Sequence, residues 1–129
     1  MKKTFDFPGF ASREASEKGT EVPIRNDTGD VSGIVIRIAG PDSLRRRQVA
    51  ERIFDARVDA GTVKAMTLSE IDAANLEEAV AATISWLFPS DFEAPDCTAE
   101  NVRKVYTEYP SILSQVIAAG KNKALFTKS

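Results

Sequence analysis

The chain has no histidine and only one cysteine among its 129 residues. Histidine is the commonest general base near neutral pH and the commonest zinc ligand, so its absence excludes the usual catalytic triads and zinc sites. Cys97 has no second cysteine with which to form a disulfide, and its neighbours Pro95, Asp96 and Thr98 provide no positive charge that would lower the pKa of its thiol. We therefore expect no enzyme, no cofactor and no bound metal.

Neither sign of charge dominates, because 17 basic and 19 acidic side chains give a formal net charge of −2. This balance creates no field that would draw the chain to nucleic acid or to an anionic membrane. No apolar run approaches the roughly 20 residues of a membrane-spanning helix. No apolar run follows Lys2 and Lys3 either, as it would in a secretory signal. We expect a cytoplasmic protein without a membrane partner, and nucleic acid is disfavoured as a partner.

The first 20 residues predict a flexible arm. Three phenylalanines surround the Pro8–Gly9 pair, and the polar segment that follows cannot bury enough apolar surface to become ordered. These phenylalanines could pack on the core or bind a partner: Phe5, Phe7 and Phe10. We divide the chain into this arm at 1–20, one globular domain at 21–120, and a flexible basic tail at 121–129, where Leu125 and Phe126 could pack on the domain.

Two strands are predicted at residues 21–24 and 34–38. The first contains a proline, which suits an edge strand, and the second is rich in β-branched residues. Residues 26–30 (NDTGD) hold only a fragment of a calcium-loop pattern, so we interpret them as the turn of a hairpin. Four helices should follow, at about 43–60, 67–87, 98–109 and 110–120. This order predicts an α+β fold, predominantly α, with an N-terminal β-hairpin followed by about four helices.

The expected helix ends follow from capping chemistry. Ser43 and Thr98 are N-cap residues, Thr67 and Glu70 form a capping box, and Gly61 can end the first helix. We expect one apolar face of each helix to meet the core. In the first two helices these faces comprise Leu44, Val49, Ile53, Ala56 and Ala60, then Ile71, Leu76, Val80, Ile84 and Leu87. In the last two they comprise Val102, Val105, Tyr106 and Tyr109, then Ile112, Leu113, Val116 and Ile117.

Three consecutive arginines are the sharpest local charge feature, and they could bind phosphate or an acidic partner: Arg45, Arg46 and Arg47. However, successive residues on a helix point about 100° apart, so the three cannot face one groove. Glu51 lies four residues after Arg47 and can pair with it within the helix. We therefore expect these arginines to lie on a solvent-exposed face of the helix, and we keep Arg45 and Arg46 as candidate partner-binding residues.

Several aromatic residues admit two interpretations. Trp86, expected at the end of the second helix, is either an aromatic at the edge of the core, with its indole N–H on a loop carbonyl, or an exposed anchor for a partner. The same alternatives apply to Tyr106 and Tyr109. Together with Phe88 and Phe92 from the following loop, these residues complete the candidate protein-binding set.

Residues 97–106 (CTAENVRKVY) begin a segment that resembles tail assembly chaperones of long, non-contractile-tailed phages of the lambdoid type. The shared pattern is a Thr/Ser-x-Glu-Asn helix start, an aromatic, a Tyr-Pro junction, and a Gln-Val helix that leads to a final aromatic. In this chain the later parts are Tyr109–Pro110, Gln115–Val116 and Phe126.

The resemblance extends over about residues 34–126. It includes Asp42–Ser43 before the arginines, and a Trp-Leu pair before an acidic loop. The chain departs from the pattern at Ser111, where a bulky aromatic is expected, and at Phe92–Glu93, where a glycine is often found.

The resemblance implies that the chain binds the tape measure protein in the cytoplasm of a bacterial host, keeps it soluble and helps tail-tube subunits polymerise around it. It implies absence from the mature virion, and a possible longer form, made by translational frameshift, that recruits the tail-tube protein. Coating a long partner implies a homo-oligomer. One alternative is a small DNA-binding phage or bacterial regulator that uses the helix with Arg45 to Arg47, whose binding would weaken steeply with salt. Another is a structural component of the virion.

Overall fold

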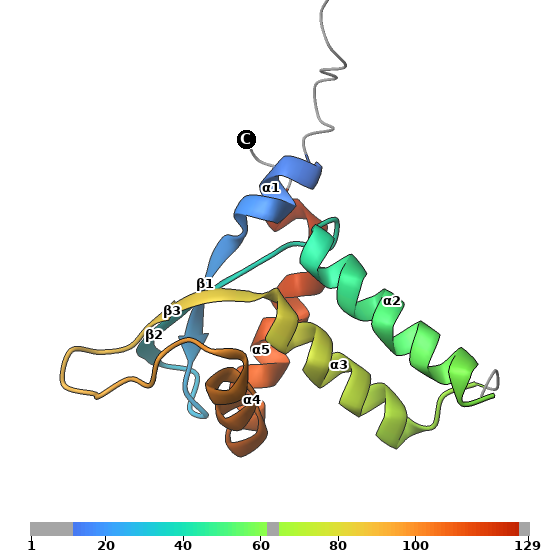
Figure 1. The fold of residues 1–129 in the computed structure, drawn as a ribbon. Coiled ribbons are helices and arrows are strands. Elements are labelled where there is room, and N and C mark those ends of the chain that lie inside the picture. Colours follow the sequence, from blue (N-terminus) through green and yellow to red (C-terminus); the bar gives the residue numbers. More distant parts are fainter. Residues whose placement is uncertain (1–11, 62–64, 127–129) are drawn as a thin grey trace, which may run out of the picture.

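The structure is a computed structural model that describes residues 12–61 and 65–126. These residues form an α+β fold that is mostly helical, as predicted (Figure 1). The strands make one antiparallel sheet in the order β1-β2-β3. In chain order the elements are α1 (Ser12–Lys18), β1 (Thr20–Arg25), β2 (Val31–Ile38), α2 (Leu44–Asp59), α3 (Leu68–Ala82), β3 (Thr83–Leu87), α4 (Ala99–Glu108), α5 (Pro110–Lys121) and the 3-10 helix η1 (Lys123–Phe126).

The predicted hairpin is confirmed. β1 and β2 are antiparallel, with Val22 opposite Ile36. The turn is built around Asn26, whose side-chain oxygen accepts hydrogen bonds from the backbone N–H groups of Thr28 (3.1 Å) and Asp30 (3.0 Å). Gly29 has a φ of 90°, a conformation that glycine adopts without steric cost. Turn chemistry therefore sets the hairpin, as the sequence indicated.

The predicted end of the second helix is wrong. α3 stops at Ala82, and the next five residues form β3, which places Trp86 opposite Ile36 of β2. Thr83 stabilises the change of direction, because its hydroxyl donates to the carbonyl of Ala79 in the last turn of α3 (2.8 Å). Leu87, expected in the core, is 67% exposed. The segment becomes a strand because the second edge of β2 accepts it there, which is tertiary information that local periodicity does not contain.

The core lies between one face of the sheet and the helices α3, α4 and α5. Burial alternates along β1, where Val22 and Ile24 are buried and Glu21 and Pro23 are exposed. The buried partners from the helices include Val80, Val102, Tyr106 and Val116. The opposite face of the sheet carries Arg37, paired with Glu21 at 3.1 Å, and the exposed Val31.

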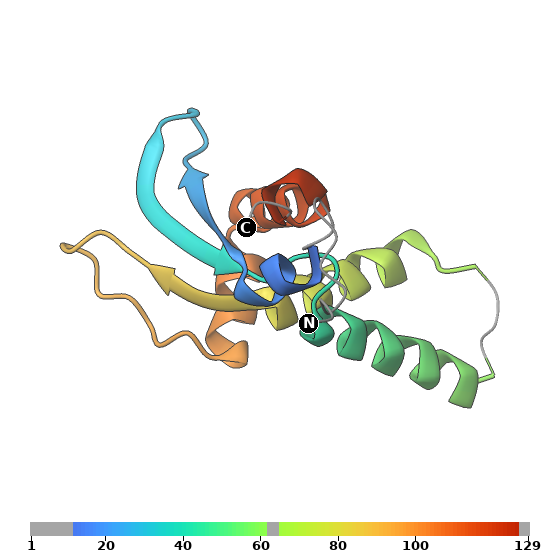
Figure 2. The same cartoon turned by 90° about the horizontal axis from the view of Figure 1, so that it is seen from above.

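Helices α2 and α3 form a helical hairpin that projects away from the sheet (Figure 2). The caps are as predicted: the Ser43 hydroxyl accepts from the backbone of α2, and the Thr67–Glu70 capping box opens α3. The expected apolar faces are partly wrong. Val49 and Val80 are buried, but Leu44, Ala56, Ala60 and Ile71 are exposed.

The reason for this difference is that α2 meets its neighbours through a face shifted toward Arg46, Val49, Ile53 and Arg57. Arg57 reaches Glu70 of α3 at 2.7 Å. The shift leaves Phe54 64% exposed on the outer side of α2.

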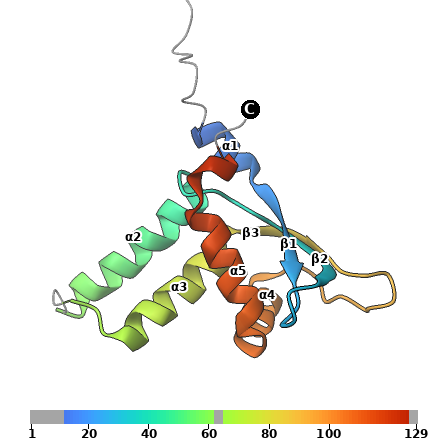
Figure 3. The ribbon, with the colours of Figure 1, turned by 180° about the vertical axis from the view of Figure 1, so that it is seen from behind.

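Parts of both chain ends that were predicted to be flexible form helices, and Phe126, one of the two tail residues expected to be able to pack on the domain, does so. Residues 12–18, predicted to belong to a flexible arm, form α1, in which Ser16 is fully buried. The Ser16 carbonyl accepts from the Gly40 N–H (2.9 Å), and its hydroxyl accepts from the Asp42 N–H (3.2 Å). In the predicted tail, η1 buries Phe126 to 1% exposure, whereas Leu125 is 44% exposed. α1 and η1 pack together at one end of the molecule, so tertiary contacts order both segments (Figure 3).

Helix α5 also bonds to the outer edge of β1 at the last residue of that strand. The Gln115 carboxamide accepts a hydrogen bond from the Arg25 N–H and donates one to the Arg25 carbonyl, each at 2.8 Å. Arg25 lies opposite Val31 at the end of β1, and both of its backbone groups face α5. One side chain thus satisfies the two backbone groups that a further strand would otherwise pair.

Candidate protein-binding groove

A groove of about 580 Å³ opens at the end of the sheet near the hairpin turn and the α4–α5 junction. Ile34 forms part of its floor, two residues before the buried Ile36 and on the same face of β2. The groove is therefore an open end of the core. Its other apolar walls come from the 88–95 loop, α4 and the first turn of α5, and include Phe88, Phe92, Val105, Tyr109 and Ile112.

The aromatic wall of the groove is a connected series of rings. Trp86 contacts Phe88 edge to face, with ring centres 5.3 Å apart, and Phe88 stacks on Phe92 at 5.3 Å. The indole N–H of Trp86 donates to the Pro95 carbonyl at 3.0 Å. These contacts hold the 88–95 loop against the sheet and turn Phe92, which is 57% exposed, toward the groove.

The two charged residues that line the groove are both acidic: Asp91 from the loop and Glu108 from the end of α4. Tyr109 follows Glu108 directly and is 55% exposed. The groove therefore combines apolar walls with a negative rim. Such a surface suits an apolar segment flanked by basic residues.

The structure distinguishes between the two interpretations of the aromatic residues. Trp86 is partly buried, with its indole N–H on a loop carbonyl, which confirms the core-edge interpretation, although it lies in a strand instead of a helix. Tyr106 is fully buried and its hydroxyl lies 2.6 Å from the Thr83 hydroxyl, so it is a core residue. Burial raises the pKa of Tyr106 to about 12, and the Thr83 hydroxyl, which can turn to donate to a phenolate, opposes part of the rise.

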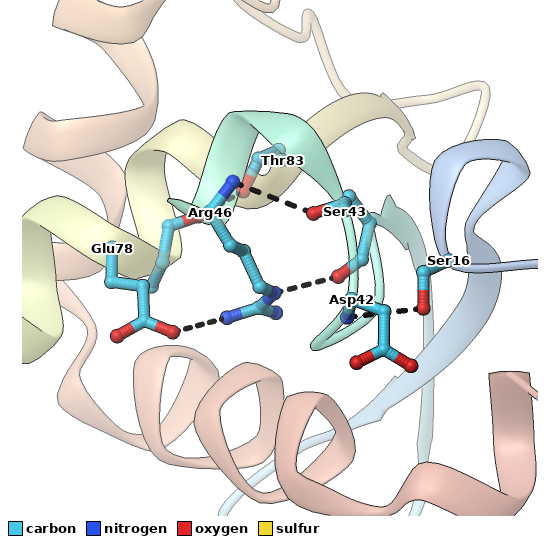
Figure 4. Close-up of polar contacts among 8 residues, drawn as sticks. Ser16, Asp42, Ser43, Arg46, Glu78 and Thr83 are labelled. Carbon is cyan, nitrogen blue, oxygen red and sulfur yellow. Dashed lines mark hydrogen bonds and ion pairs between the residues drawn. The ribbon is translucent and has the colours of Figure 1, made fainter. Parts of the chain in front are cut away.

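Arg46, predicted as a candidate surface contact, is 8% exposed and belongs to the interior (Figure 4). Its Nε donates to the Ala39 carbonyl at 2.8 Å, and its Nη1 pairs with Glu78 at 3.0 Å. Nη2 has no hydrogen-bond partner among the residues that the structure describes. This atom lies 2.5 Å from where a Cβ on Gly120 would be.

The three consecutive arginines therefore do not form one basic surface. Arg45 donates to the Thr83 carbonyl at 3.4 Å, Arg46 is internal, and Arg47 pairs with Glu51 at 4.0 Å. Arg45 and Arg47 are exposed on α2. This geometry provides no groove-facing basic cluster for the phosphate backbone of a nucleic acid.

The predicted site residues thus fall into three groups. The structure brings Phe88, Phe92 and Tyr109 together in the lining of the groove, with Trp86 packed against Phe88 beside it, and places Arg45, Arg46 and Tyr106 elsewhere. Phe5, Phe7 and Phe10 lie outside the described residues. Sequence reasoning missed Ile34, Val105 and Ile112 as groove residues. For Ile34, β-strand alternation indicates the core face of the sheet, but only the structure shows that the helices leave this position open.

Other chemical features of the described chain are few. Burial raises the pKa of the Cys97 thiol, which keeps it protonated and poorly nucleophilic. Within residues 12–61 and 65–126, no group of three or more acidic or cysteine side chains is placed to hold a metal ion. In the same residues, no helix has the length and apolar character needed to cross a membrane.

Comparison with known proteins gave no match among protein-family models, curated proteins or solved structures.

Proposed function

We propose that this chain is a phage tail assembly chaperone that binds the tape measure protein through the aromatic groove and keeps it soluble while tail-tube subunits polymerise around it. Two kinds of support bear on the proposal. One is the resemblance carried by residues 97–106 and the residues that follow. The other is the structural observation on which the proposal chiefly rests: an open apolar groove with the exposed rings of Phe92 and Tyr109.

The groove suits an amphipathic helix of such a partner. A helix presents apolar anchors at intervals of three and four residues, and an apolar groove of this size can receive one or two of them. Basic residues beside those anchors would meet Asp91 and Glu108 at the rim. A few anchors per copy would give modest affinity, which allows tail-tube subunits to displace the chaperone.

The biological setting is part of the same proposal. The chain would act in the cytoplasm of the bacterial host and be absent from the mature virion. A longer form made by translational frameshift would recruit the tail-tube protein. Several copies would cover one tape measure protein.

The test is co-expression with the tape measure protein of the same phage or prophage. Wild-type chain should keep that protein in the soluble fraction and co-purify with it. Replacing both Phe92 and Tyr109 by serine should weaken binding by about tenfold or more, because truncating a central aromatic anchor typically costs 2 kcal/mol or more. Phe54→Ser is the matched control, since Phe54 is 64% exposed on α2, away from the groove.

Two results would contradict the proposal. One is a tape measure protein that remains insoluble with wild-type chain. The other is equal binding by the groove variant and the wild type, which would remove the groove from the mechanism.

A further inference from the structure

We infer that the groove also binds residues 1–11 of a second copy of this chain, so that copies join head to tail. The inference uses the groove that the proposed function assigns to the tape measure protein, but it does not depend on that partner. It rests on three observations: the chemistry of the groove, the composition of the 11 residues that precede α1, and the position of α1 relative to the groove.

The chemistry of the two surfaces is complementary. Residues 1–11 (MKKTFDFPGFA) place three phenylalanines within seven residues after Lys2 and Lys3. The groove offers apolar and aromatic walls for the rings and two carboxylates, Asp91 and Glu108, for the lysines. In an extended bound segment Phe5 and Phe7 point to the same side, toward the groove, and the acidic Asp6 points away.

The geometry favours a second copy over the same chain. α1 lies at one end of the sheet, whereas α4 and the hairpin turn, which flank the groove, lie at the other (Figure 1). Thr20, just after α1, pairs with Ile38, and Ile34 of the groove lies four residues from Ile38, which is about 13 Å along β2. Phe10 stands two residues before Ser12 and so reaches only about 7 Å beyond α1. Phe5 and Phe7 lie far enough before α1 to reach the groove of their own chain, but Phe10 does not, so all three rings can occupy one groove only when that groove belongs to a second copy.

A contact between two different surfaces of identical chains is heterologous and does not close after one pair. A copy that contributes residues 1–11 at one contact still offers its groove at another, so further copies can add. Such an array suits a long partner with repeated anchors. It also means that the tape measure protein would displace residues 1–11 from the groove when it binds.

The experiment uses two full-length variants that each lack one half of the contact. The first, with Phe5, Phe7 and Phe10 replaced by serine, keeps the groove; the second, with Phe92 and Tyr109 replaced by serine, keeps the segment. Analytical ultracentrifugation of the wild type should show association that grows with concentration. Each variant alone should be monomeric, and an equimolar mixture should form a one-to-one dimer. Phe54→Ser should associate as the wild type does.

Trp86 provides a second measurement, because it is the only tryptophan and contacts Phe88 in the groove wall. A synthetic peptide of residues 1–11 should change Trp86 fluorescence in the first variant but not in the second. Replacing Lys2 and Lys3 by glutamate should weaken association at least tenfold, and replacing Asp91 and Glu108 by lysine in the same chain should restore it.

Three outcomes would overturn the inference. They are a wild type that stays monomeric, variants that associate as the wild type does, and a mixture of the two variants that remains monomeric. Because none of these measurements includes the tape measure protein, the inference can fail while the proposed function stands. Far-UV circular dichroism of each variant checks that it is folded, and the charge exchange tests the contact without removing any aromatic residue.

Discussion

Replacing Tyr106 by phenylalanine should reverse the order of stability between the variant and the wild type as the pH rises. The Thr83 hydroxyl has one hydrogen, which it donates to the Ala79 carbonyl at 2.8 Å. The Tyr106 hydroxyl, 2.6 Å from the same oxygen, must then be the donor of their shared hydrogen bond. Tyr106→Phe removes this bond but leaves Thr83 bonded to Ala79. We expect a loss of about 0.5–1.5 kcal/mol in the free energy of unfolding at neutral pH.

At alkaline pH the effect changes sign. The pKa of Tyr106 is about 12 in the folded chain, against 10.0 for an ordinary tyrosine, so between these values the folded state keeps a proton that the unfolded state has released. Stability then falls by about 1.4 kcal/mol for each unit of pH, and by on the order of 2–3 kcal/mol in total. Tyr106→Phe has no such proton, so the two stability curves should cross near a pH of about 11.

Urea unfolding followed by far-UV circular dichroism, at a series of pH values on either side of 10, measures both effects. The informative quantity is the difference in stability between wild type and variant, because contributions that the two chains share cancel in it. Tyr109→Phe is the control for the loss of a tyrosine hydroxyl, because Tyr109 is 55% exposed and takes no part in the contact between Thr83 and Tyr106. A difference between the wild type and Tyr106→Phe that stays constant from neutral to alkaline pH would refute the reasoning.

Two further predictions concern charged side chains in the helices. Gly120→Ala should destabilise the fold by about 1–3 kcal/mol, because the new Cβ would lie 2.5 Å from Nη2 of Arg46, whose guanidinium is already bonded on two sides; an unchanged urea midpoint would show that the guanidinium is free to move. The hydrogen bonds of Arg103 to Glu77 lower the pKa of that carboxyl below 4.5. Above pH 4.5, Glu77→Gln should therefore lower the free energy of unfolding by up to about 1 kcal/mol, a small value because the pair is partly exposed. This difference in stability between wild type and variant should disappear as the pH falls through the lowered pKa of Glu77. A stability difference that grows on acidification would contradict the conclusion that Arg103 stabilises the ionised form of Glu77.

The parts of the fold that local chemistry decides were predictable. Asn26 and Gly29 build the hairpin turn, and Ser43, Thr67 and Thr98 cap their helices as expected. In each case the deciding contacts lie within four residues along the chain. A single sequence contains all the information that such features need.

The features that depend on distant residues were not predictable. β3 continues the apolar pattern of α3, and only the open edge of β2 makes it a strand. α1 is polar and short, and it is ordered because Ser16 packs against Gly40 near Phe126. Arg46 resembles its neighbours in sequence, yet Ala39 and Glu78 bring it into the interior.

The candidate site was predictable in part. Large aromatics often anchor partners, and three of the predicted aromatics, Phe88, Phe92 and Tyr109, do line one groove, with Trp86 in contact with Phe88. The other walls could not be found in this way, because Ile34, Val105 and Ile112 look like ordinary core residues. They line the groove only because the sheet extends beyond the helices that cover it.

The contact between Gln115 and Arg25 restricts which residues position 115 can accept during evolution. The side chain there must carry a donor and an acceptor at the same reach, because it bonds to both the N–H and the carbonyl of one residue. Glutamate has no hydrogen-bond donor when it is ionised, and lysine has no acceptor. Methionine has no donor and only a weak acceptor, and asparagine is one methylene shorter than glutamine. Relatives that keep this sheet edge should therefore keep glutamine at this position even where the surrounding surface has diverged, which makes position 115 a marker for recognising distant members.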